Sequence, residues 1–357
     1  MDLRNPASSM RTPTLAHCLC VLLLPAWTAG AQTEIPDEKV EKVEKAETVD
    51  FDSSWRRPLG SRNQTPMALL FVYLTPDRAA SIGKGELDLD IGFDYSNIIQ
   101  EQRTENEFLR LDLEYLRTLV ALKRGFGHGL ELGFSVPFYI YYGGFLDPFV
   151  SSFHEAFGLP NLLRGQTPYG LVDFQYRRGD EVVLAGMSSF GAVGDITLDV
   201  KKTLHEETSG ALAVRGTLKL PTGDPQSLSG SGAADFGLGV AFDRIGPKYG
   251  LYLNVNYYVL GTPERFATRD YYSLMVGADW RFKPRVAALL QVDYMRPPIQ
   301  SEVLNLNQPG IQLGLGLRYR HSDSFTYEWR LVEDLSSFSP DFTFAFQMEV
   351  RSKGGRR

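Results

Sequence analysis

Few residues of this chain have the types and spacing that catalysis or metal binding requires. The chain has five histidines and two cysteines, and His17, Cys18 and Cys20 fall in a predicted signal segment. Three of the other four histidines lie at predicted turns without a close His or Cys partner, so we predict no metal site and no cofactor. The four histidines outside the signal segment are His128, His154, His205 and His321.

His154 is the exception that needs weighing, because it lies in the longest predicted loop beside Ser151, Ser152 and Glu155. Neighbours on a loop do not make a catalytic triad, which is defined by geometry, so we predict that the protein is not an enzyme. A lipid-modifying enzyme using His154 is the third functional hypothesis. Phe153, His154 and Phe157 are also candidates for a loop that folds inward and constricts a pore, although an external loop that packs on itself is favoured.

The charged residues that could select a solute occur in two rows. Asp88, Asp90 and Asp94 alternate with apolar residues over 86–96, a pattern that places them on one face of a strand. The next predicted strand carries the second row. We predict that all six line a lumen on adjacent strands, where they either bind polar solutes or close a narrow barrel with ion pairs. The second row is Arg110, Asp112 and Glu114.

The elements that must position these rows are strands of about ten residues with alternating apolar and polar side chains, repeated from residue 86 to residue 350. Short turns alternate with long links, as in an up-and-down antiparallel β-barrel that spans a membrane. We count about 14 strands, or 12 if residues 170–190 belong to a loop. Residues 65–74 do not fit this alternation, and we predict either an extra strand or a segment inside the barrel.

Local patterning does not separate a soluble β-sandwich from a membrane barrel, since both have one apolar face. Four features together favour the barrel: a signal peptide, strands of about ten residues, the alternation of short and long connections, and the absence of cysteine after the signal segment. Arg4 and Arg11 precede a short apolar run and Ala29-Gly30-Ala31, the order of a secretory signal peptide cleaved after Ala31. Without 1–31 the formal net charge moves from -6 to -7, since two arginines and one aspartate leave. A mildly acidic exported chain is a poor nucleic-acid binder.

The predicted organisation has four parts. Residues 1–31 are a signal peptide, 32–62 a charged periplasmic linker, 63–351 an outer-membrane β-barrel and 352–357 a basic tail. This assignment implies the outer membrane of a Gram-negative bacterium, with membrane lipid, the barrel-assembly machinery and periplasmic chaperones as partners. Tyr and Trp near the strand ends are typical of aromatic girdles at the lipid interface.

Three segments carry a resemblance to a known group. They are residues 62–66 (Arg-Asn-Gln-Thr-Pro), 153–160 (Phe-His-Glu-Ala-Phe-Gly-Leu-Pro), and 218–224 (Leu-Lys-Leu-Pro-Thr-Gly-Asp) with 230–233 (Gly-Ser-Gly-Ala). The sequence resembles the bacterial outer-membrane proteins grouped as domain of unknown function 3187, over about residues 60–351. The third segment is also similar to barrels linked to uptake of aromatic or apolar compounds. The resemblance implies a location and a fold, and it supplies no residue roles.

Two main functional hypotheses remain open. The first is a porin-like passive channel that conducts small solutes through the lumen. The second is a structural or surface-interaction barrel whose lumen is filled. The solute, the state of the lumen and the oligomeric state are left undetermined by the sequence.

Overall fold

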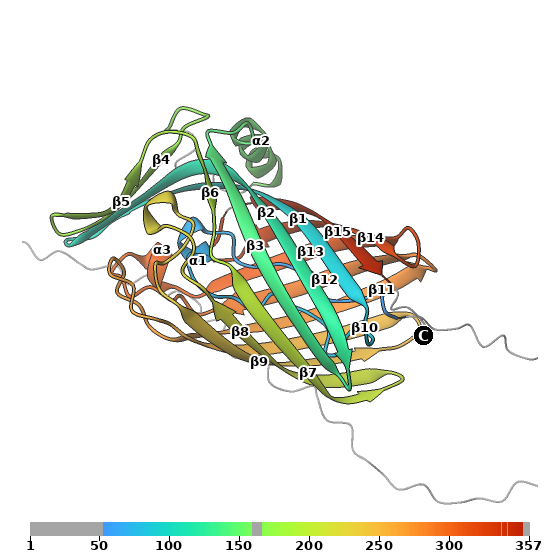
Figure 1. The fold of residues 1–357 in the computed structure, drawn as a ribbon. Coiled ribbons are helices and arrows are strands. Elements are labelled where there is room, and N and C mark those ends of the chain that lie inside the picture. Colours follow the sequence, from blue (N-terminus) through green and yellow to red (C-terminus); the bar gives the residue numbers. More distant parts are fainter. Residues whose placement is uncertain (1–52, 159–165, 337, 341, 353–357) are drawn as a thin grey trace, which may run out of the picture. The chain divides into compact units, whose positions relative to one another are not determined.

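The structure is a computed structural model that describes residues 53–158, 166–336, 338–340 and 342–352 (Figure 1). The predicted signal peptide with its cleavage site near Ala31, most of the predicted linker and the tail after Ser352 lie outside the described residues. Among the described residues, no helix is both long and apolar enough to cross a membrane.

Twelve antiparallel strands form a closed wall. Consecutive wall strands are hydrogen-bonded neighbours, and the ring closes where β15 pairs with β1 and where β2 pairs with β3. A closed ring leaves no unpaired strand edge, which is the condition for crossing a bilayer with strands. The wall strands are β1 (Leu87–Arg103), β2 (Glu107–Gly127), β3 (Leu130–Tyr142), β7 (Thr197–Glu207), β8 (Gly210–Lys219), β9 (Asp235–Ile245), β10 (Tyr249–Val259), β11 (Tyr271–Lys283), β12 (Val286–Met295), β13 (Gly310–Arg320), β14 (Phe325–Asp334) and β15 (Phe342–Ser352).

The count of 14 strands is therefore wrong, and the alternative of 12 is confirmed. The additional strands β4 (Asp173–Arg178), β5 (Glu181–Gly186) and β6 (Phe190–Val193) are real but branch from the wall. β2 is 21 residues long, about twice what a bilayer needs, and its first part pairs with β4 instead of β3. β6 likewise pairs with the last residues of β3, beyond the point where β7 begins. These strands lengthen the sheet on one side, as Figure 1 shows at the upper left.

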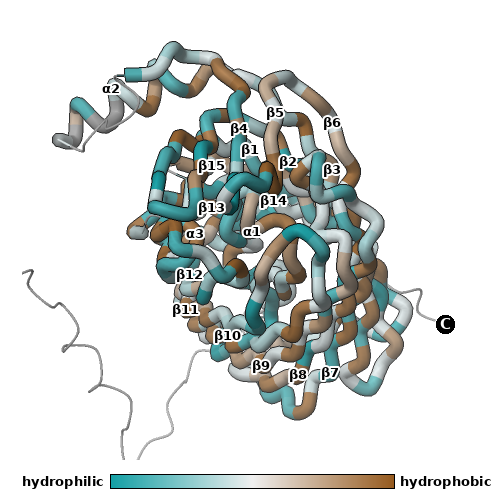
Figure 2. The backbone as a smooth tube through the Cα atoms, turned by 90° about the vertical axis from the view of Figure 1, so that its left-hand side faces the viewer, coloured by the Kyte–Doolittle hydropathy of each residue, from teal (hydrophilic) through white to brown (hydrophobic). Residues whose placement is uncertain are grey.

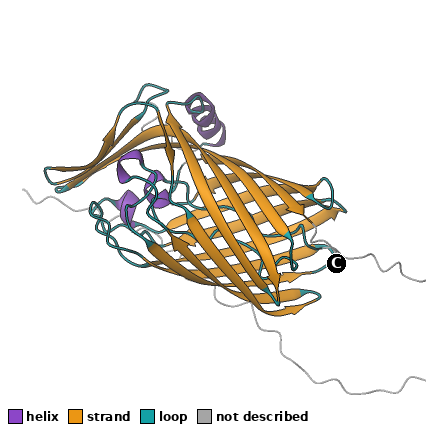
Figure 3. Cartoon of the chain, in the orientation of Figure 1, coloured by secondary structure: helices purple, strands orange, loops and turns teal. Residues whose placement is uncertain are grey.

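The two ends of the barrel differ. At the end that we call the short-turn end, adjacent strands are joined by 128–129, 208–209, 246–248, 284–285 and 321–324, and β1 begins and β15 ends. At the opposite, long-loop end lie the long connections 143–196, 220–234, 260–270, 296–309 and 335–341, together with one short turn, 104–106, between β1 and β2. The described helices gather at the long-loop end (Figure 3). They are α1 (Pro66–Leu69), α2 (Asp147–Phe157), α3 (Leu304–Asn307) and the 3-10 turn η2 (Pro225–Ser227).

The two faces of the wall show the burial expected of a membrane barrel rather than a sandwich. On β10, Leu251 and Val255 are 57% and 46% exposed, whereas Asn254 and Asn256 between and beside them are 0% and 4% exposed. The apolar face thus points outward and the polar face is buried inside. Closure of the ring therefore confirms the barrel, which the sequence favoured over a β-sandwich.

The lumen is not empty. Residues 53–83, which we call the inner segment, enter at the short-turn end, cross to the long-loop end, form α1 there and return to start β1. Figure 2 looks onto the long-loop end, where α1 lies within the ring of wall strands. Residues 65–74, left open as an extra strand or an internal segment, belong to this inner segment, and so does the stretch 53–62 that was expected in the linker. Successive wall contacts of the inner segment are Arg56–Asp279 on β11, Leu59–Gln291 on β12, Val72–Asp235 on β9, Asp77–Asn254 on β10 and Ala79–Asp243 on β9.

The wall is shaped to admit the inner segment. Leu59 lies against Gly316 of β13, where a Cβ atom would overlap the Leu59 side chain. Glycine at this position therefore lets the two backbones approach closely. The Leu59 backbone is held there by Gln291, whose amide group accepts from the Leu59 N–H at 2.9 Å and donates to its carbonyl at 3.2 Å.

The tip of the inner segment builds an apolar core at the long-loop end. The core joins α1 and the residues after it to the inner face of the β2 extension, to β4 and β5, and to the loops around α3. Its members are almost fully shielded from solvent, as in the interior of a soluble domain. They include Met67, Leu69, Leu70, Phe71, Leu109, Leu111, Leu113, Phe174, Leu184, Phe266, Ile299, Val303, Leu306 and Phe338.

Candidate functional site

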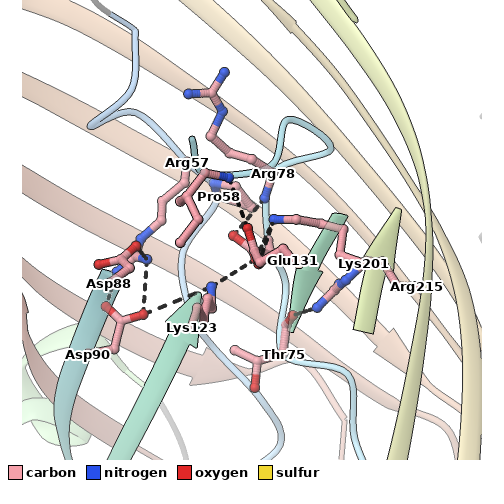
Figure 4. A network of polar contacts seen from close by, with 12 residues as sticks. Arg57, Pro58, Thr75, Arg78, Asp88, Asp90, Lys123, Glu131, Lys201 and Arg215 are labelled. Carbon is pink, nitrogen blue, oxygen red and sulfur yellow. Dashed lines mark hydrogen bonds and ion pairs between the residues drawn. The ribbon is translucent and has the colours of Figure 1, made fainter. Parts of the chain in front are cut away.

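The inner segment enters the lumen through arginine–carboxylate contacts. Arg57 lies among three carboxylates of β1 and β15: its Nη2 is 2.5 Å from Asp90 Oδ1 and 3.2 Å from Glu349 Oε2, and its Nη1 is 4.0 Å from Asp88 Oδ2 (Figure 4). Arg351 of β15 adds a second cation 3.0 Å from Asp88. All three carboxylates are buried, so each depends on these cations to offset the loss of hydration.

In the returning part of the inner segment, an inner carboxylate pairs with cations of the wall. Asp77 Oδ2 lies 2.8 Å from Lys123 Nζ of β2 and 3.1 Å from Lys201 Nζ of β7. Lys201 also reaches Glu131 Oε1 of β3 at 3.1 Å, so three neighbouring wall strands are joined through one inner carboxylate. Arg78 follows with Asp243 at 3.6 Å.

A second network of ion pairs joins side chains of the wall strands, on the long-loop side of Arg57. Asp94 of β1 accepts from Arg117 and from Arg330, each at 2.7 Å. Arg330 also contacts Glu328 at 2.8 Å, and Arg318 contacts Glu328 and donates to the carbonyl oxygen of Pro58 at 3.1 Å. Through Arg318 this network also holds the inner segment.

Between the inner segment and β1, β2, β3 and β7 lies a central cavity of about 90 Å³. Gly92 faces it, and a Cβ atom added there would meet no atom within 4 Å. The lining is rich in charge of both signs, in near balance. The charged lining residues are Arg57, Asp77, Asp90, Asp94, Arg117, Lys123, Glu131, Asp199, Lys201, Arg215 and Arg330.

The central cavity continues in both directions. A mouth cavity of about 350 Å³ at the short-turn end shares Arg57, Asp77, Lys123, Glu131 and Lys201 with it. An upper cavity of about 30 Å³ shares a different set of residues with the central cavity and reaches toward Leu69 and Phe71 of the apolar core. We call this chain of three cavities the side path. The central and upper cavities share Tyr73, Thr75, Arg117, Leu119, Ser135 and Thr197.

The residues predicted to line the lumen separate into two groups. Asp88, Asp90 and Asp94 lie on the inner face of β1, and all three are buried. Arg110, Asp112 and Glu114 lie on the opposite face of β2, because the register that pairs Asp94 with Arg117 turns the odd-numbered residues 109–115 inward. These apolar odd-numbered residues belong to the apolar core at the long-loop end. The prediction from the sequence therefore placed the wrong row of β2 side chains on the inner face.

The outward residues have structural partners of their own. Glu114 accepts from the backbone N–H groups of Phe145 and Leu146 at 3.0 and 2.6 Å, which fixes the start of α2 on the outer side of the sheet. Arg110 lies 2.9 Å from Asp173 of β4 and 3.3 Å from Glu101 of β1. These contacts stiffen the sheet extension and do not touch the side path.

The predicted constriction residues belong to α2. The side chains of Phe153, His154 and Phe157 lie outside what the structure describes. The helix itself begins at Asp147, which accepts from Asn97 at 2.9 Å and from the Gly170 N–H at 3.0 Å on the outer face of the sheet.

Three carboxylates of the site could ligate a cation. Asp88, Asp90 and Glu349 each offer an oxygen within 4.8 Å of the others. Arg57 and Arg351 supply the positive charge at this cluster, so a metal ion would have to displace a guanidinium group. The arrangement is that of an ion-paired anchor for the inner segment.

Most of the site was missed in the sequence because its ligands come from the inner segment. Arg56, Arg57, Asp77 and Arg78 flank the apolar run around α1, and such paired charges at its two ends were the available signal. Lys123, Glu131 and Lys201 follow from strand alternation once the inward face of each strand is known. That face became known only with the register.

Comparison with solved structures supports the fold. The chain is similar to the COG4313 outer membrane channel from Pseudomonas putida F1, with a TM-score of 0.53, 13% identity and coverage of 78% of this chain and 100% of that chain. The KdgM porin has a TM-score of 0.39 and 9% identity, with coverage of 74% of this chain and 98% of that chain. The Ralstonia pickettii toluene transporter TbuX has a TM-score of 0.38 and 9% identity, with coverage of 77% of this chain and 90% of that chain. Of these three, the COG4313 channel has a TM-score above 0.5, and at 13% identity it is evidence of a shared fold and of nothing further. No curated protein matches the sequence.

A family model covers nearly all of the described chain. The model described as a protein of unknown function (DUF3187) matches residues 47–351, which include the inner segment and every wall strand. The chain thus belongs to the DUF3187 family, and its fold is that of an outer-membrane β-barrel.

Proposed function

We propose that this protein is a gated outer-membrane channel for small polar solutes, whose lumen is closed by the inner segment except for the side path. The observation that carries the proposal is the overlap of three cavities along β1, β2, β3 and β7. The side path opens at the short-turn end and stops beneath the apolar core. This arrangement is that of a closed channel, and conduction requires movement of the core or of the inner segment.

The lining suits polar solutes. Rings of charge set selectivity in pores, and here both signs alternate along the side path. In a barrel of this type short turns face the periplasm, so we infer that the mouth cavity opens to the periplasm of a Gram-negative cell. The apolar core then faces the exterior and forms the gate.

The test is solute flux and single-channel conductance of the purified chain in liposomes and planar bilayers. Ala121 lines the central cavity, and Ala121→Trp should reduce both quantities at least about tenfold by filling the side path. Val120→Trp is the matched control, because Val120 pairs with Ile91 on the lipid face of the same strand. Equal flux in the two variants would contradict conduction along the side path.

A second candidate is a barrel with a permanently filled lumen that serves a structural or surface-interaction role. The apolar core favours it, since buried apolar contacts of this extent stabilise a closed state. Deletion of residues 53–82 separates the two candidates. If the wild-type chain never conducts under any voltage or solute gradient while the deletion variant conducts freely, the channel proposal fails and the filled barrel stands. Retention of heat-modifiable gel mobility checks that the deletion variant is still a barrel.

A further inference from the structure

The upper cavity contains a guanidinium group without a counter-ion. Arg62, in the inner segment just before α1, donates from Nη2 to the carbonyl oxygens of Ala68 and Phe71 at 3.1 and 3.2 Å. Within the described part of the chain it forms no ion pair, and its Nε is buried without a hydrogen-bond partner. This differs from Arg57, which lies among three carboxylates.

A second arginine of the same cavity leaves part of its hydrogen-bonding capacity unused. Arg117 of β2 pairs with Asp94 through Nη1, but its Nε is also buried without a hydrogen-bond partner in the described residues. Arg62 and Arg117 line the same cavity, and so do Lys219 and Asp195, which pair with each other at 2.5 Å. Arg117 is paired with Asp94 and Lys219 with Asp195, so Arg62 is the cation of this cavity that has no carboxylate partner among the described residues. An uncompensated charge of this kind is costly to bury.

The rest of the lining is mostly apolar or aromatic. Leu69, Phe71, Tyr73, Leu119, Pro137 and Tyr139 surround the space, and Thr75, Ser135 and Thr197 add hydroxyl groups. The Arg62 guanidinium lies 5.3 Å from the centre of the Tyr73 ring. A concave apolar surface with a few convergent polar donors is the usual form of a small-molecule site.

We infer that the upper cavity and the adjoining part of the central cavity, about 30 and 90 Å³ with a shared lining, form one binding site for a small organic anion. Arg62 and Arg117 would bind its carboxylate, and the surrounding side chains would enclose its apolar or aromatic body. A guanidinium group presents several donors in one plane and matches a carboxylate in two-point contact. The site would stand at the inner side of the proposed gate. This inference deepens the proposed channel function by naming its solute class, and it rests on that function for its physiological meaning.

The test is equilibrium binding by calorimetry to the purified full chain in detergent, with benzoate as the probe and neutral benzamide as its near-isostere. Wild-type protein should bind benzoate at least about tenfold more tightly, because a hydrogen bond to a charged group contributes more than one to a neutral group. Arg62→Met should abolish most of this preference, and Arg62→Lys should restore part of it. Arg110→Met is the control, since Arg110 lies outside the side path, and it should leave the preference unchanged.

The ratio of the two affinities separates binding from folding, because Arg62 also holds the carbonyl groups around α1. Loss of both ligands to the same extent in Arg62→Met would overturn the inference, as would equal affinities in the wild-type chain. If Arg62→Met does not fold, Ser135→Trp fills the cavity from β3 and should abolish benzoate binding, whereas Val136→Trp on the outer face should not. Unchanged benzoate binding in Ser135→Trp would also overturn it.

Flux is measured separately with a neutral solute. If the chain conducts the neutral solute but does not bind benzoate more tightly than benzamide, the anion site is refuted and the channel proposal stands. If the chain binds benzoate more tightly than benzamide but shows no flux, the channel proposal is refuted and the binding site stands. The two failures are therefore distinguishable.

Discussion

The two ends of the lumen hold the inner segment by different forces. Near the short-turn end the contacts are ion pairs, such as Arg57 with Asp90 and Asp77 with Lys123, beside cavities that together exceed the volume of a small solute. At the long-loop end the contacts are apolar and densely packed around Leu70 and Phe71. Ion pairs beside water weaken with salt, whereas apolar packing does not. The comparison teaches that the inner segment has one electrostatic anchor and one hydrophobic anchor, which can be loosened independently.

Two single-cysteine variants, Ala68→Cys and Ala79→Cys, can report how tightly each anchor holds the inner segment. Ala68 in the apolar core is 2% exposed. Ala79 is 0% exposed: it follows Arg78, donates its N–H to Asp243, and packs its methyl group in a small cluster with Ala211, Ala213 and Ala241. The only cysteines of the chain are Cys18 and Cys20, so a single cysteine at either site reports locally once those two are removed or replaced. The rate of reaction with a hydrophilic thiol reagent then gives the free energy of opening at each end.

The largest effect is expected for the hydrophobic anchor. Phe71 is 1% exposed and makes an edge-to-face contact with Phe266 at 6.2 Å between ring centres. Phe71→Ala should lower the free energy of opening at Ala68→Cys by about 3–5 kcal/mol, since it removes a buried ring and leaves a cavity. Phe236→Ala, on the lipid face, is the control and should leave the labelling rate unchanged. Equal rates in Phe71→Ala and the wild-type background would show that the core does not hold the inner segment.

The next effect concerns the electrostatic anchor. Arg57→Met leaves Asp90 and Glu349 buried with less compensating charge, and we expect a loss of about 3 kcal/mol, seen as faster labelling at Ala79→Cys. The Arg320–Asp323 pair at an exposed turn supplies the control, and Arg320→Met should change labelling by less than twofold. If Arg57→Met accelerated labelling at Ala68→Cys by as much as at Ala79→Cys, the two anchors would act as one.

A smaller effect distinguishes the two ends without any further mutation. Raising the ionic strength from about 0.1 M to 1 M shortens the screening length from about 10 Å to about 3 Å. We expect labelling at Ala79→Cys to accelerate several-fold, because water in the mouth cavity admits salt to the ion pairs. Labelling at Ala68→Cys should stay constant. Parallel salt responses at both positions would contradict the division into two anchors.

The smallest effect tests the inner and outer faces of the wall. Arg110 is partly exposed on the outer side of the sheet extension, where its pairs with Glu101 and Asp173 face solvent. Arg110→Gln should change the free energy of opening by less than about 0.5 kcal/mol at either reporter, as is usual for exposed pairs. A change above 1 kcal/mol would indicate that Arg110 contacts the inner segment after all.

The fold could be predicted from the sequence to a large extent, because alternation over short repeated strands is a local property of the chain. The candidate site could be predicted only in part. Asp88, Asp90 and Asp94 lie on the face that the alternation indicated, but on β2 both faces carry regular rows, and only pairing with β1 decides which row faces inward. β4 and β5 have weaker strand patterns than the wall strands, and a strand pattern does not specify which strand it pairs with.

The sequence by itself determined that strands with one apolar and one polar face must close into a barrel, since closure is the only way to satisfy every backbone group in lipid. It also determined where charged side chains occur along each strand. Only the tertiary structure decided that residues 53–83 fill the lumen, that twelve strands close the ring, and that Arg62 and Arg117 share a cavity. The physical reason is range: alternation acts between neighbours in the chain, whereas Arg57 and Glu349 meet only because closure places the inner segment beside the last strand.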